Sequence, residues 1–176
     1  HLLPGGFFLP IVLAVLLSAL LGLAIGFLIL RRRGVYFSLL TLAFTAMIYY
    51  IAYRWTAFTG GENGLGGFTR PVVLGVDLND QLVFYGLVAG VVLAAAWLAL
   101  RVVQSPFGSV LVAIRENEQR ALFLGYPVRR YKLLAFLLST TFAGLGGALL
   151  AFLKYFVSAD LVHVTFSGEI LALCII

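Results

Sequence analysis

Residues 7–30 read FFLPIVLAVLLSALLGLAIGFLIL, a run of 24 residues without a charged side chain. An α-helix rises about 1.5 Å per residue, so a helix of this length exceeds the roughly 30 Å hydrocarbon core of a lipid bilayer. The apolar residues are continuous, whereas those of a membrane-spanning β-strand alternate with polar ones. The run therefore predicts a transmembrane α-helix.

Three further apolar runs follow at residues 34–53, 82–100 and 133–153, and the second of them extends to about residue 103 if its last turn is included. Each is long enough to cross a bilayer as a helix. A fifth span is predicted to begin near residue 167 and to continue to residue 176. We therefore predict an all-α protein: a polytopic transmembrane helix bundle that forms one partial domain over residues 1–176. Because the fifth run is short, we expect the sequence to be a truncated piece of a longer protein.

The composition agrees with a membrane protein. Of the 176 residues, 62% are hydrophobic and 11% are charged, against about 45–50% and about 25% in soluble globular domains. One cysteine and two histidines disfavour a disulfide framework and a Cys/His metal site. The basic residues stand between apolar runs, which favours contact with lipid over contact with nucleic acid.

Lysine and arginine are distributed unequally between the connections. Residues 31–33 are three arginines, and the segment 101–132 holds six more basic residues, whereas the connections on the opposite side hold three. The positive-inside rule places the arginine-rich connections in the cytoplasm. The loop 104–132 is therefore predicted to be cytoplasmic.

Small residues recur within the predicted spans. Gly22 and Gly26 form a GxxxG pair, as do Gly86 and Gly90, and the fourth span carries a glycine and alanine cluster at residues 143–148. Small residues allow close approach of helices in lipid. The spans are therefore predicted to pack together as a bundle.

Three hydroxyl groups follow one face of the second span. Ser38, Thr41 and Thr45 are spaced i, i+3 and i+7. They could line a polar translocation path, but hydrogen bonds to carbonyls of their own helix or to a neighbouring helix are the favoured alternative. The four spans contain no Asp, Glu, Lys, Arg or His between their ends, which argues against a proton pump or a voltage sensor.

The predicted outer loop is rich in glycine and contains two candidate contact residues. Glu62 and Asn63 could receive a partner or a substrate. A solvated turn is the favoured alternative for both.

Residues 105–127, SPFGSVLVAIRENEQRALFLGYP, predict a short amphipathic helix on the cytoplasmic side. Pro106 suits the first turn of a helix, and Gly125 followed by Pro127 predicts its end through a left-handed glycine cap. Such a helix could lie in the membrane interface or dock into a groove of a partner. The absence of tryptophan from its apolar face favours docking.

The order of motifs resembles the LivM-type permease subunits of the branched-chain amino-acid ATP-binding-cassette (ABC) importers. The matching stretches are RGVYFSLLTLA (33–43), TGGENGL (59–65), SPFGSVL (105–111), AIRENEQRA (113–121), LGY (124–126), YKLLAF (131–136), the glycines of the fourth span and SGE (167–169). The related urea-importer permeases share the cytoplasmic helix, but LVHVTFSGE at 161–169 is more similar to the amino-acid branch.

The resemblance implies a type II ABC importer permease, a multi-pass protein of the bacterial inner membrane. Its partners would be a second homologous permease, two cytoplasmic ATPase subunits and a periplasmic substrate-binding protein, which Glu62 and Asn63 could contact. ATP would be bound by the ATPase subunits, so this chain would need no cofactor, no metal and no catalytic residue of its own.

The resemblance also implies that residues 113–124 form the coupling helix that contacts the ATPase subunits. We expect Ile114 and Ala121 to fill the ATPase groove and Arg115 and Arg120 to pair with its carboxylates; solvated charges are the alternative. The full set of candidate coupling residues is Ile114, Arg115, Glu116, Glu118, Arg120, Ala121, Leu124 and Gly125.

Other functions remain open at the level of sequence. A permease for urea, short amides or other amino acids would share this architecture, and a non-transporting membrane interaction module would share its spans. A membrane enzyme is disfavoured, because the few carboxylates lie mainly in loops without a His/Cys cluster nearby.

Overall fold

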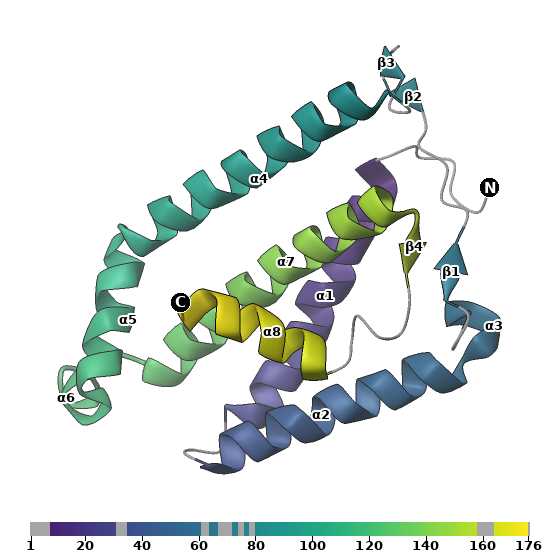
Figure 1. The fold of residues 1–176 in the computed structure, drawn as a ribbon. Helices are drawn as coiled ribbons and strands as arrows, with labels where there is room; N and C mark the ends of the chain where they lie inside the picture. The colour runs from purple at the N-terminus through teal and green to yellow at the C-terminus, as the bar shows by residue number, and fades with distance from the viewer. Residues whose placement is uncertain are drawn as a thin grey trace. The chain divides into compact units, whose positions relative to one another are not determined.

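The computed structural model describes residues 8–30, 35–60, 64–66, 72–73, 76–77, 80–157 and 164–175 (Figure 1). The helices are α1 (Phe8–Ile29), α2 (Val35–Arg54), α3 (Thr56–Thr59), α4 (Gln81–Val103), α5 (Pro106–Glu116), α6 (Glu118–Phe123), α7 (Val128–Lys154) and α8 (Val164–Ile175). The short strands are β1 (Leu65–Gly66), β2 (Val72–Val73), β3 (Val76–Asp77) and β4 (Phe156–Val157). The strands form two-residue antiparallel pairs, β1 with β4 and β2 with β3. The predicted all-α class is confirmed.

Three of the described helices are long and apolar enough to cross a membrane: Leu9–Ile29, Gln81–Val103 and Val128–Lys154. They coincide with the first, third and fourth predicted spans. The span predicted at 34–53 is the 20-residue helix α2, and its crossing of the membrane stays a prediction.

Two predicted boundaries differ from the structure. Helix α7 begins at Val128, five residues before the predicted start, and α8 begins at Val164, three residues early. The prediction for α7 ended the apolar run at the basic residues, but a helix can continue through charged residues at the headgroup level. With 27 residues, α7 is about 40 Å long and extends beyond the hydrocarbon core.

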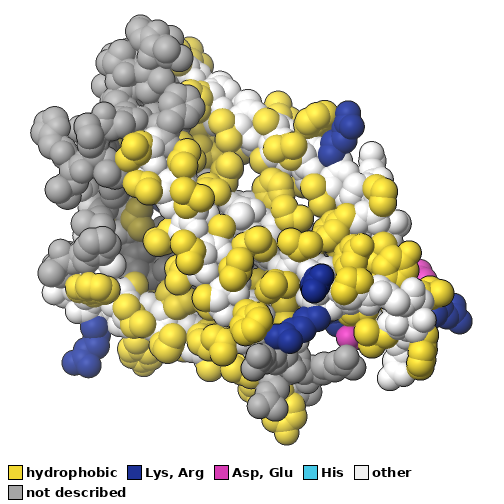
Figure 2. Space-filling view, turned by 180° about the vertical axis from the view of Figure 1, so that it is seen from behind, with side chains coloured by type: hydrophobic (Ala, Val, Ile, Leu, Met, Phe, Trp, Pro, Cys, Tyr) yellow, Lys and Arg dark blue, Asp and Glu magenta, His cyan; other side chains and the backbone are white. Residues whose placement is uncertain are grey.

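Large apolar side chains on the helices face outward. Leu17, Leu20 and Leu93 are among the exposed residues of α1 and α4, and Figure 2 shows hydrophobic side chains over much of the visible face, with Lys and Arg in small groups. In water such a surface would be unfavourable by about 25 cal/mol per Å² of exposed apolar area. Lipid removes this cost, so the exposure fits a membrane protein.

The described chain forms two compact units, residues 1–30 with 70–149, and residues 31–69 with 150–176. In the first unit, α1 and α7 pack antiparallel (Figure 1). Gly22 faces Thr140, Gly26 faces Phe136, and Gly144 faces Ser18, so closely that an added Cβ atom would collide at each glycine.

The small residues of the sequence thus divide into two groups. Gly22, Gly26 and Gly144 lie in the α1–α7 contact, as predicted for small residues in a bundle. In contrast, a Cβ atom added at Gly86, Gly90, Gly146 or Gly147 would have no neighbouring atom within 4 Å among the described residues. A GxxxG spacing therefore marks a helix contact in α1 but not in this part of α4.

The second unit joins α2, α3 and α8 with the pairing of β1 and β4. Leu65 pairs with Val157 and Gly66 with Phe156. Gly60 and Gly64 have positive φ angles of 72° and 65°, which glycine adopts without steric cost. Gly60 caps the end of α3, and Gly64 directly precedes β1.

We predict that Gly144→Ala destabilises the protein by about 1 to 3 kcal/mol, because the new methyl group would collide with Ser18 across the α1–α7 contact. The matched control is Gly146→Ala on the same helix, where the methyl group meets open space. That control should be neutral or stabilising by up to about 1 kcal/mol, since alanine favours helix more than glycine does. Thermal unfolding of the full-length permease in detergent measures both changes, and equal shifts would contradict the assigned contact.

Candidate functional site

The predicted amphipathic helix is two helices in the structure. α5 ends at Glu116, α6 begins at Glu118, and Asn117 between them is extended, with φ −153° and ψ 99°. The Asn117 side chain accepts a hydrogen bond from the backbone N–H of Arg120 at 2.9 Å. Asparagine is among the preferred N-cap residues because its side chain satisfies such a free N–H group. This capping ends one helix and starts the next, which corrects the prediction of one continuous helix over residues 113–124.

The predicted end of this segment is confirmed at Gly125. Its φ is 84°, and its N–H donates to the carbonyl of Leu122 at 2.9 Å while that of Tyr126 donates to Ala121 at 3.2 Å. This pair of bonds is the Schellman motif that closes helices at a left-handed residue. The chain then enters α7 at once, at Val128.

Helices α5, α6 and α7 meet at a small apolar core, which we call the corner core. It consists of Ile114, Ala121 and Val128, all buried, with Val110 and Tyr131 packed against them. Ile114 is only 6% exposed. The expected orientation of Ile114 and Ala121 toward an ATPase groove is therefore corrected, because both side chains are enclosed by their own chain.

The tip of α6 instead exposes a different apolar group. Phe123 is 88% and Leu124 70% exposed. We call this pair the apical pair. Sequence reasoning included Leu124 but missed Phe123. The signal was its position two residues before Gly125, at the end of the helix, where no later turn of helix can cover it.

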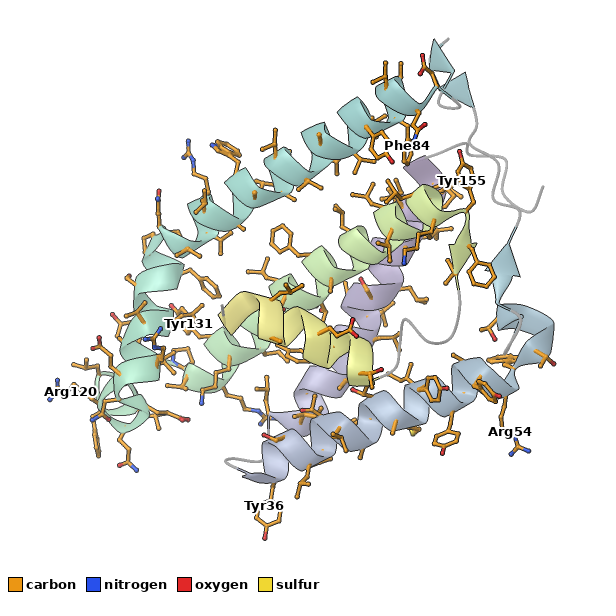
Figure 3. The ribbon with its side chains drawn as sticks, viewed as in Figure 1. Tyr36, Arg54, Phe84, Arg120, Tyr131 and Tyr155 are labelled. Atoms are coloured by element: carbon orange, nitrogen blue, oxygen red, sulfur yellow. The ribbon has the colours of Figure 1, made fainter. Side chains whose placement is uncertain are left out.

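The charged residues of the corner differ in their surroundings. Arg115, Glu116 and Arg120 are exposed, and Figure 3 shows Arg120 pointing away from the corner. Among the described residues neither Arg115 nor Arg120 has an ion-pair partner. In contrast, Glu118 pairs with Lys132 of α7 at 2.7 Å.

The hydroxyl groups of α2 lie in the second unit. Ser38 is exposed, and Thr41 and Thr45 are half-buried. The Thr45 hydroxyl donates to the carbonyl of Thr41 at 2.9 Å, which is the helix-internal bond weighed as the alternative. A role of these residues in a translocation path stays a prediction. Glu62 and Asn63 lie outside the described residues.

The geometry therefore presents membrane-length helices and, between α4 and α7, a compact corner with an apolar tip and exposed cations. A model of the family described as "Branched-chain amino acid transport system / permease component" matches residues 1–176. The chain belongs to this permease family. This family is a class of transporter permeases and not a class of enzymes, and the long apolar helices fit a multi-pass membrane protein.

Two curated relatives agree with this assignment. Each is named high-affinity branched-chain amino acid transport system permease protein LivM, one from Escherichia coli (strain K12) and one from Salmonella typhimurium (strain LT2). Both are 30% identical to the chain over an alignment 194 positions long, which covers 97% of the chain and 46% of the relative. The chain therefore spans about half the length of these relatives. No solved structure matches it.

We predict that Ile114→Ala lowers the free energy of unfolding of the corner by about 2 to 5 kcal/mol, because it leaves a cavity in the corner core. Leu124→Ala is the control, and it should change stability by less than about 0.5 kcal/mol, since Leu124 is exposed. Hydrogen exchange of the amides of residues 106–132 in the full-length protein measures both. Equal protection in the two variants would contradict the inward orientation of Ile114.

Proposed function

We propose that the protein is a permease subunit of an ABC importer for branched-chain amino acids in the bacterial inner membrane. The observation that carries the proposal is the family match over all 176 residues. The relatives named for this transport system support the same substrate class. The apolar runs 7–30, 82–100 and 133–153 within the membrane-length helices hold no charged residue, which suits a substrate path that is driven by a motor outside this chain.

The partners follow from the reaction. An importer permease must be driven by ATPase subunits and supplied by a substrate-binding protein; we propose two ATPase subunits, a second homologous permease and a periplasmic binding protein. The ATPase subunits would bind the ATP. Glu62 and Asn63 remain candidate contacts for the binding protein, and Ser38, Thr41 and Thr45 remain candidates for the translocation path.

We further propose that the α5–α6 corner is the part of this chain that contacts an ATPase subunit. The predicted topology places it in the cytoplasm, where ATP is bound. Its outward-facing groups are the apical pair, Phe123 and Leu124, with Arg115 and Arg120 nearby on α5 and α6. Such a surface is complementary to an apolar groove with carboxylates at its rim.

The corner is suited to transmit a movement. ATP binding would close the ATPase subunits on each other and shift the groove that holds the apical pair. Because the corner connects α4 and α7, a shift of the corner displaces the cytoplasmic ends of both helices. The bundle would then alternate between outward and inward access, as expected for coupling through differential contacts in two states.

We predict that Phe123→Asp in the full-length importer reduces substrate-stimulated ATP hydrolysis and branched-chain amino-acid uptake by about tenfold or more, because it places an uncompensated charge in an apolar groove. Phe123→Leu is the matched control and should retain most of both activities. The measurement is uptake into proteoliposomes with internal ATP and the cognate binding protein, using leucine and, for comparison, urea. Uptake of urea instead of leucine would overturn the substrate assignment, and unchanged coupling in Phe123→Asp would overturn the docking surface.

A further inference from the structure

Helix α6 is connected to α7 by two contacts on matching faces. Glu118 and Ala121 are three residues apart and lie on one face of α6, while Val128 and Lys132 are four residues apart and lie on one face of α7. Ala121 joins Val128 in the corner core, and Glu118 pairs with Lys132. One apolar contact and one ion pair therefore lie one above the other between the two helices.

We infer that Glu118 and Lys132 are positioning residues that make α6 and the first turns of α7 one rigid lever. The inference rests on the proposed function: force that an ATPase subunit applies at the apical pair would reach the membrane through α7 as well as through α5 and α4. The ion pair itself would touch neither the substrate nor the ATP.

The turn between the two helices supports a rigid connection. Its four residues, 124–127, carry hydrogen bonds at each step. Besides the Schellman pair at Gly125 and Tyr126, the N–H of Val128 donates to the carbonyl of Tyr126 at 2.8 Å and that of Arg130 to Pro127 at 2.9 Å. A turn with its backbone groups paired has little freedom to bend, so it limits the swing of α6 relative to the start of α7 and leaves mainly the rotation of α6 to be fixed by side chains.

Aromatic rings also pack at the junction of α5, the turn and the start of α7. The Tyr131 ring of α7 stacks on Phe107 of α5, with ring centroids 5.5 Å apart, and meets Tyr126 edge to face at 6.3 Å. Figure 3 shows Tyr131 at the junction of these helices. The rings fix the first turn of α7 against the corner.

The ion pair completes the lever on its more exposed side. The side chains of Lys132 and Glu118 are 36% and 28% exposed, and the Lys132 Nζ atom lies 2.7 Å from the Glu118 Oε2 atom. An ion pair of this exposure adds little to overall stability. Its effect is to restrain the rotation of α6 about the turn. The contact of Ala121 with the corner core is too small to fix this rotation alone.

The lever continues into the membrane. α7 packs on α1 at Gly144, where Ser18 lies against the glycine, and α1 contacts α7 again at Gly22 and Gly26. Close-packed helices move together because neither can yield at the contact. A displacement of α6 would therefore be passed through α7 to α1.

The decisive experiment measures the amino-acid molecules transported per ATP hydrolysed by the full-length importer in proteoliposomes. Lys132→Gln and Glu118→Gln should each lower this ratio by about fivefold, the limit set by an ion pair of partial exposure. The double variant should be no worse than either single variant, and the exchanged pair Glu118→Lys with Lys132→Glu should restore the ratio. Arg130→Gln, which removes an exposed charge from the same turn of α7, is the matched control and should leave the ratio unchanged.

A second measurement tests whether the two helices stay together during transport. Cysteines are placed at positions 118 and 132 and joined by a short bifunctional thiol reagent. The lever requires that the cross-linked importer still transports. Loss of transport on cross-linking, or an unchanged ratio in both Gln variants, would overturn the inference. An importer without binding-protein-dependent uptake in its wild-type form would instead overturn the proposed function.

Discussion

The hydrocarbon core of a bilayer offers no hydrogen-bond partner to a peptide group, and the rest of this structure depends on that constraint. Each apolar run must pair its N–H and C=O groups within itself, so it becomes a helix. Once the helices are formed, the hydrophobic effect does not drive them to associate, because lipid is as apolar as their side chains. Their contacts must come from close packing, and α1 and α7 achieve this where Gly22, Gly26 and Gly144 bring the backbones together.

The same constraint explains where the chain becomes irregular. Short helices, strands, turns and polar caps lie between the long helices, and the corner between α4 and α7 is one such place, where the predicted topology places water. There Asn117 can cap α6, Gly125 can adopt a positive φ, and Glu118 can pair with Lys132. The corner is thus a small water-exposed structure held between two membrane-length helices, and this location suits a part that communicates with a cytoplasmic motor.

The prediction for the corner was correct in its limits and wrong in its orientation. Pro106 and Gly125 have strong local preferences, so they mark the start and the end without knowledge of the fold. Ile114 and Ala121 are seven residues apart, which on one continuous helix would place them on one outward face. The extended Asn117 interrupts the helix, so the two side chains face each other inside the corner. The interruption at Asn117 thus buries Ile114 and Ala121 and leaves other side chains of the corner exposed.

By itself the sequence determined the helical class, the positions of the apolar spans and the Gly125 stop, because each depends on chain-local properties: hydropathy, length and the conformational freedom of glycine. The tertiary structure alone decided which glycines are used in contacts. Gly22 and Gly26 have the same spacing as Gly86 and Gly90, yet only the first pair meets another described helix. It also decided that Glu118 binds Lys132. These outcomes depend on which helix surfaces pack against each other. The contacting residues are 14 or more positions apart in the sequence, and no local preference encodes such contacts.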